Sequence, residues 1–443
     1  MTEDAEWMRL LRELFGDRAD EAVLEMRRMG IDPEALGAAS GLSATPAMME
    51  HVLAQLRAVL EQSRGQDVNW TLAHDVARGV AAHGGDPSVS AAQAESLRGS
   101  VSRAELWLDA ATELPPSTLT PHVWSRAEWV EATLPTWRRV AGPVAISVSS
   151  ALSALFTEAA DATDDATLML EQIAPTVTGM HVGQAAGAMA REAFGGTDLG
   201  LLLVPEPRAV MIPDAITHFA ENLDIPVSEV QDFLALRECA HVRLFQRAPW
   251  LAGQLVTAIE KYASAVEIDP DALDAAVQRA HSGDPASIQK AMSQGIFASH
   301  HSEAQQEALR TVETLLALIE GWVETVTALA ASAHLDHVPQ LVELIRRRRA
   351  ASGPAEDAFA TLLGLDLRPR RLREAAAMWG TLGATEGSQA RDTLWSHPDL
   401  LPTSADLDDW RTWIDVRPSA RPDDIDAELR TILDEADPRD SAP

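Results

Sequence analysis

Apolar residues recur at the three- and four-residue spacing of helices along most of the chain, and turn residues divide this pattern into segments. Residues 1–65 read as short amphipathic helices. A second helical block extends from Val68 to about Phe194, and Pro115-Pro116 and Pro121 interrupt it. We expect four tryptophans of this block to anchor helix packing: Trp107, Trp124, Trp129 and Trp137.

One stretch has the pattern of strands instead. Leu199 to Val204 is apolar, Pro205-Glu206-Pro207 supplies a turn, and Ala209 to Ile212 is apolar again. This order predicts a short β hairpin or two edge strands. Ala, Leu, Glu and Arg dominate elsewhere, so the predicted fold class is mainly α, an α-rich α+β fold with a small β hairpin.

Helical periodicity returns after this stretch. Asp224-Ile225-Pro226 precedes a helix that extends to about Arg247, and Ser228 with Gln231 fits a capping box at its start. Further helices are expected over about 302–333 and up to the run Arg346 to Arg349. The predicted division of the chain is an N-terminal helical segment (1–65), a helical core (66–415) and an acidic tail rich in Pro and Asp with a short helix (416–443).

Charge and cysteine content restrict the classes of partner. The formal net charge is −31, which repels phosphate backbones and anionic lipids and argues against nucleic acid and membranes as partners. Cys239 is the single cysteine, so no intramolecular disulfide and no thiolate zinc cluster can form. The N-terminus lacks a secretory leader pattern and no apolar run reaches the ~18 residues of a membrane span, so we expect a cytoplasmic protein.

The candidate chemistry lies in the helix that contains Arg237-Glu238-Cys239-Ala240-His241. Zinc hydrolases of the zincin type place two histidines four residues apart on one helix face, with a glutamate directly after the first. Arg237 occupies the position of the first histidine here, whereas Glu238 and His241 keep their register. A single Glu-x-x-His match is common in helical proteins, so the motif alone is a weak signal.

The surrounding sequence resembles the zincin-like metallopeptidase family of actinobacteria, whose members are often labelled hydrolases. The resembling blocks are Leu236–Phe245 (LRECAHVRLF), Trp124–Ala145, Glu320–Val323, Arg346–Ala350, Gly364–Trp379 and Trp395–Leu407. The resemblance implies a zincin-like core, with the hairpin near the motif helix, and makes zinc the candidate cofactor. It also implies Glu238 as the general base, His241 and Glu320 as ligands, and Glu324 as a supporting residue.

Arg237 alters this expectation. A guanidinium stays protonated, with a pKa above ~12, so it cannot bind a metal through a lone pair. His241 and Glu320 alone fall short of the three protein ligands typical of catalytic zinc. Arg237 can instead bridge the carboxylates that would otherwise repel each other, as a replacement for the metal. The alternative is an Arg237 that points to solvent.

Several other residues have mainly structural interpretations. Cys239 is two residues from His241, so the two side chains do not share a helix face and a buried, inert thiol is expected. The basic runs Arg346–Arg349 and Arg368–Arg371 favour pairing with acidic faces of the same chain over contacts with phosphate. The remaining histidines considered are His181, His218, His300-His301, His334 and His337, and we expect structural roles for the two pairs.

Three hypotheses follow for the function. The first is a degenerate zincin that binds no catalytic zinc and acts as a binding or scaffold protein for a peptide or protein partner. The alternative is an active zinc-dependent metallohydrolase or peptidase, with Glu238 as base and His241 and Glu320 as ligands. The third is a purely structural helical protein of an intracellular assembly.

Overall fold

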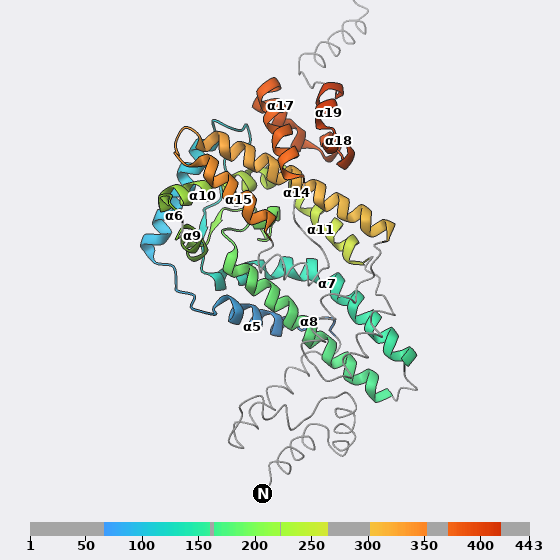
Figure 1. Cartoon of the computed structure of the whole chain (residues 1–443). Helices are drawn as coiled ribbons and strands as arrows, with labels where there is room; N and C mark the ends of the chain where they lie inside the picture. Colours follow the sequence, from blue (N-terminus) through green and yellow to red (C-terminus); the bar gives the residue numbers. More distant parts are fainter. Residues whose placement is uncertain (1–65, 160–163, 222, 265–301, 352–370, 418–443) are drawn as a thin grey trace, which may run out of the picture.

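The computed structural model describes residues 66–159, 164–221, 223–264, 302–351 and 371–417. Helices make up 74% of the residues it describes, which confirms the mainly helical fold class (Figure 1). Residues 1–65 and 418–443 lie outside the described ranges, as do His300-His301 and Arg368–Arg370. The division into three segments therefore stays a prediction.

The described elements are mostly α-helices, with three short 3₁₀ helices and two short strands. The α-helices are α5 (Trp70–Ala81), α6 (Ala91–Leu108), α7 (Arg126–Ala159), α8 (Asp164–Glu192), α9 (Pro213–Ala220), α10 (Val227–Arg247), α11 (Pro249–Ser264), α14 (Glu303–Ala331), α15 (Val338–Ala350), α17 (Leu372–Thr393), α18 (Ser404–Asp408) and α19 (Trp410–Val416). The 3₁₀ helices are η2 (Asp198–Gly200), η3 (Leu394–Ser396) and η4 (Pro398–Leu400), and the strands are β1 (His122–Val123) and β2 (Val210–Met211).

The predicted hairpin is wrong, although β2 falls within the predicted stretch. The described strands β1 and β2 pair in parallel, with His122 opposite Val210, so β2 finds its partner far away in the sequence. Pro205 and Pro207 lack the N–H groups that a hairpin ladder needs. On the other edge of β2, Ile212 N donates to Phe194 O at 3.0 Å. Both edges of β2 are therefore in use.

Close backbone contact fixes the end of α8 against the rest of the core. Gly179, Gly183 and Gly187 lie one turn apart on α8 and face α5, and a Cβ added at Gly183 would lie 2.5 Å from Ala73 O. From α7, Trp129 Nε1 donates to Gly195 O at 2.9 Å. These contacts hold the Gly195-Gly196 turn, which borders the candidate site.

Tryptophans form much of the core, and two of the four predicted ones are among them. Trp129 and Trp137 are buried, whereas Trp107 and Trp124 are only partly buried. A second group of fully buried tryptophans belongs to α14, α17 and η3, and its members are Trp322, Trp379 and Trp395. The periodic apolar pattern did not single these out, because each lies in a helix whose partner is distant in sequence.

The motif helix α10 lies at the centre of the fold. Its residues from Asp232 to Phe245 are all buried, so even the charged ones face other elements. The expected capping box is wrong: α10 begins at Val227 after Pro226, and no side chain caps it. Helix α14 packs against α10, α11 and α17, and Gly321 allows α17 so close that a Cβ there would lie 2.7 Å from Ala375 Cβ.

One helix of the described residues, α14, is long and apolar enough to cross a membrane by composition alone. Of the apolar window in α14, 83% is buried inside the protein. The hydropathy of α14 is therefore explained by its place in the core.

Candidate functional site

The candidate site lies where α10, α14 and α15 meet. Helix α10 supplies Arg237 and His241 from adjacent turns of one face, because residues four apart align along a helix. Helix α14 supplies Glu320, which is 1% exposed, and α15 supplies Arg349. His241 and Glu320 meet as expected, although Glu320 lies 79 residues beyond His241, and Arg237 bonds Glu320 as well. Glu238, which was expected to converge with His241 and Glu320, hydrogen-bonds other partners.

Glu320 is the centre of this site. Its Oε2 accepts a hydrogen bond from Arg237 Nη2 at 2.6 Å, and its Oε1 accepts one from Arg349 Nη2 at 2.6 Å. His241 Nε2 lies 3.1 Å from the same Oε1. Burial alone would raise the pKa of Glu320, but Arg349, Arg237 and His241 outweigh it and hold that pKa far below its ordinary value. Glu320 is thus an ionised carboxylate between two guanidinium groups.

His241 is held from both ring nitrogens. Its Nδ1 lies 2.9 Å from Arg237 O, one turn earlier in α10, and its Nε2 faces Glu320. A backbone carbonyl and an ionised carboxylate only accept hydrogen bonds. A neutral imidazole can donate to one of them, whereas the imidazolium form can donate to both.

Glu238 is turned to a different set of partners. Its Oε1 accepts hydrogen bonds from Gly196 N at 2.9 Å and Val210 N at 3.1 Å, and its Oε2 accepts one from Thr197 Oγ1 at 2.5 Å. Burial raises the pKa of Glu238 despite these three hydrogen bonds. Glu238 therefore ties α10 to the end of α8 and to β2, and a Cβ at Gly195 would lie 2.4 Å from its Oε2.

Glu324 does not contact Arg237. It accepts two hydrogen bonds from Arg346 of α15, from Nε at 2.9 Å and from Nη2 at 2.5 Å. Two ion pairs thus join the antiparallel helices α14 and α15, Glu324 with Arg346 and Glu320 with Arg349. The prediction that the basic run pairs with acidic groups of its own chain is confirmed, because Arg347 also pairs with Glu343 at 2.9 Å.

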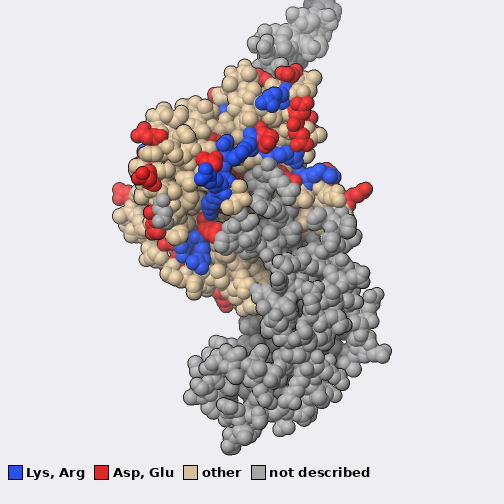
Figure 2. All heavy atoms as spheres, in the orientation of Figure 1, with Lys and Arg blue, Asp and Glu red and all other residues tan. Residues whose placement is uncertain are grey.

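The remaining residue of this run, Arg348, reaches the end of α8. Its Nη2 donates to Glu192 O at 2.6 Å, its guanidinium lies 4.0 Å above the Phe194 ring, and its Nη1 is 3.6 Å from Asp198. Burial would raise the pKa of Asp198, but Arg348 and Arg349 lower it overall. In Figure 2, arginine and lysine side chains gather in a band on one face, with acidic side chains among them.

Arg349 and Thr197 are the site residues that sequence reasoning missed. The run Arg346–Arg349 offered a signal, because its first and last members share a helix face, as do Glu320 and Glu324. The Gly-Gly-Thr sequence at residues 195–197 offered another, since paired glycines allow close approach of backbone to a side chain. Neither signal identifies the partner without the fold.

The other candidates have structural surroundings. Burial raises the pKa of the Cys239 thiol well above its ordinary value, which confirms a buried and inert cysteine. His334 stacks on Trp107 with ring centres 4.2 Å apart, and His337 lies 3.1 Å from Glu229. His218 is largely exposed and lies 3.3 Å from Glu221, and no site residue bonds His181 in the described ranges.

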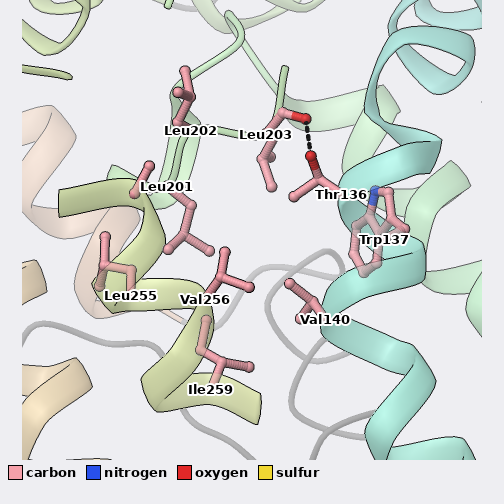
Figure 3. A pocket seen from close by; sticks show the side chains of 10 residues that line it. Thr136, Trp137, Val140, Leu201, Leu202, Leu203, Leu255, Val256 and Ile259 are labelled. Atoms are coloured by element: carbon pink, nitrogen blue, oxygen red, sulfur yellow. Dashed lines mark hydrogen bonds between the residues drawn. The ribbon is translucent and has the colours of Figure 1, made fainter. Parts of the chain in front are cut away.

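An apolar pocket lies apart from these charged residues. It is lined by α7, α11 and residues 201–203, including Trp137, Leu203 and Ile259 (Figure 3). Its volume is about 20 Å³, room for about one water molecule. A cavity of this size and apolar lining offers no place for a substrate.

The fold and the charged cluster on α10 and α14 define a helical protein of the zincin-like class. The chain belongs to the zincin-like metallopeptidase family, whose model matches residues 68–414. A crystal structure of a candidate hydrolase with a novel fold from Chloroflexus aurantiacus matches with a TM-score of 0.54 and 18% identity. The match covers 79% of this chain and 100% of that chain, and at this identity it shows the fold alone. Comparison with curated proteins gives no significant match.

Family membership implies a zinc site, but the residues present do not fit one. Arg237 fills the position of the first ligand, and its guanidinium lies against Glu320. Among the described residues, no group of three or more His, Cys, Asp and Glu side chains is placed to hold a metal ion. A catalytic zinc needs three protein ligands and an open position. His241 and Glu320 supply two, and Arg237 puts a fixed cation at the position of the third ligand.

Acid is expected to weaken the fold through Glu320. Its pKa is lower in the folded than in the unfolded chain, so its stabilisation is present above about pH 4.5, its ordinary pKa, and is lost as the pH falls. Urea unfolding between pH 5 and 3 should show wild type losing up to about 1.4 kcal/mol per pH unit more than Glu320→Gln. Equal slopes for the two proteins would contradict the ionised Glu320.

Proposed function

We propose that this chain is a catalytically degenerate zincin, in which Arg237 replaces the metal, and that it acts as a cytoplasmic binding or scaffold protein for a peptide or protein partner. The observation that carries the proposal is the 2.6 Å ion pair between Arg237 and the buried Glu320. A guanidinium supplies the positive charge that the carboxylate requires.

The replacement keeps the structure of the site but removes its chemistry. A bound zinc ion generates hydroxide by lowering the pKa of its water, whereas a guanidinium has no coordination position to offer. The general-base position supports the same conclusion. The carboxylate of Glu238 accepts three hydrogen bonds from Gly196, Thr197 and Val210, which take three of its roughly four acceptor positions and tie it to the protein.

One observation favours the alternative, an active zinc-dependent hydrolase with His241 and Glu320 as ligands. His241 Nδ1 lies 2.9 Å from a backbone carbonyl, a contact that commonly orients metal-binding histidines, and its Nε2 points to Glu320 Oε1. For zinc to bind there, both Arg237 and Arg349 would have to leave Glu320. This rearrangement breaks two ion pairs to a buried carboxylate, so its cost in free energy is high.

Zinc addition distinguishes the two. A ligand that binds only the folded chain stabilises it by RT ln(1 + [L]/Kd) and so raises its melting temperature. We expect micromolar zinc to leave the melting temperature of the wild type unchanged and to raise that of Arg237→His. An equal rise in both proteins would favour the hydrolase. An equal rise in wild type and His241→Ala would instead indicate zinc bound elsewhere.

A further inference from the structure

The two arginines on Glu320 have donors to spare. Arg237 and Arg349, here called the arginine pair, each bond Glu320 through a single nitrogen, Nη2. An arginine carries five N–H groups in a planar fork. In the described part of the chain, no acceptor is hydrogen-bonded to Nε or Nη1 of either residue, although Arg349 lies 4.0 Å from Asp198.

A fully satisfied buried arginine of this protein offers a comparison. Arg243 is fully buried, and all three of its nitrogens donate: Nε to Glu105, Nη1 to Leu114 O, and Nη2 to Glu105 O and Asp109. Arg346 bonds Glu324 through two nitrogens. Unpaired nitrogens also occur elsewhere, since Nε of Arg126 and Nε of Arg417 are buried without a partner among the described residues. What distinguishes the arginine pair is that both of its members bond the same buried carboxylate.

The spare donors are not sealed inside the core. The side chains of Arg237 and Arg349 are 10% and 7% exposed. Neither contributes a fully buried atom without a hydrogen-bond partner. The unused N–H groups thus keep some contact with solvent, and Glu320 holds both guanidiniums in position.

We propose that the arginine pair binds the carboxylate group of a ligand in place of the metal. A carboxylate accepts parallel hydrogen bonds from a guanidinium fork, and such charge-assisted bonds are about twice as strong as neutral ones. Glu320 fixes the two cations, so little side-chain entropy is lost when the ligand binds. This site names the ligand class for the binding protein proposed above, and it rests on that proposal because bound zinc would displace the arginine pair.

Two sources supply this chemistry, the C-terminal carboxylate of a peptide and a small free carboxylic acid. Acetate tests the second, with acetamide as its uncharged match. Acetyl-trialanine tests the first, with its C-terminal amide as the match. Calorimetric titration at constant ionic strength should show saturable binding of acetyl-trialanine or acetate and none of the two amides.

Substitutions then test whether the carboxylate binds at the arginine pair. Arg349→Gln should weaken it by at least about tenfold, because it removes a charged fork. Arg347→Gln is the matched control, since Arg347 lies two residues away on α15, is 75% exposed and pairs with Glu343. Arg237→Lys keeps the ion pair to Glu320 but lacks the fork, so it should fold and bind more weakly. Arg237→Lys decides the question if Arg349→Gln fails to fold.

Three results would overturn the proposal: no saturable binding, equal binding of acid and amide, or equal affinity in wild type and Arg349→Gln. Zinc measurements separate this failure from that of the proposed function. A zinc-free wild type that binds no carboxylate rejects the arginine pair as a site and leaves the degenerate zincin intact. A wild type with tightly bound zinc rejects both.

Discussion

Arg237→Ala is expected to lower the free energy of unfolding by about 3 kcal/mol, at the lower end of the ~3–5 kcal/mol for breaking a buried ion pair. The reason is that Glu320, 1% exposed, loses the partner of its Oε2. Arg349 and His241 stay on Oε1 and limit the loss. Urea unfolding of the wild type and the variant measures the difference.

A second substitution tests the cause. Combining Arg237→Ala with Glu320→Gln removes the stranded charge, so the double variant should recover part of the loss. Arg347→Ala serves as control, because that side chain is 75% exposed and should change little. If Arg237→Ala unfolds like the wild type, the arginine has no role in replacing the metal.

Two successive substitutions are expected to raise the affinity of the site for zinc. Arg237→His rebuilds the third ligand beside His241 and Glu320, but Arg349 still occupies Glu320 Oε1. Adding Arg349→Gln frees this oxygen, so the double variant should bind zinc at least about 100-fold more tightly than the wild type, or about 2.8 kcal/mol. Competition with a chromophoric chelator measures each affinity.

The order of the zinc affinities of these variants tests which arginine excludes the metal. We expect Arg237→His to fall between the wild type and the double variant, and Arg349→Gln alone to stay close to the wild type because only two ligands are present. If Arg349→Gln by itself restores zinc, Arg237 is not the residue that excludes the metal. If the double variant binds no better than the wild type, the three side chains are not arranged as ligands.

Local pattern predicted much of the fold. Helical spacing identified α14 and α15, and Ser302 caps α14 in a capping box. The hairpin failed because an apolar run of four to six residues does not reveal its partner. Val210 and Met211 pair with His122 and Val123, almost ninety residues earlier, and proline removed the donors that a hairpin requires.

The motif likewise revealed part of the site. Helix geometry places Arg237 beside His241, and the family resemblance supplied Glu320. Neither could supply Arg349, since its approach to Glu320 depends on the register between α14 and α15. The partners of Glu238 could not be predicted either. Its motif position suggests a base, whereas its hydrogen bonds to Gly196 and Val210 depend on tertiary contacts.

The zinc content of the purified wild type tests the central claim most directly. The chain is produced with zinc in the medium, dialysed against a weak chelator and analysed by inductively coupled plasma mass spectrometry. If Arg237 replaces the metal, zinc should be well below one ion per chain, and His241→Ala should contain the same amount. One tightly held zinc per wild-type chain that is lost in His241→Ala would contradict the claim and make the protein a metallohydrolase candidate.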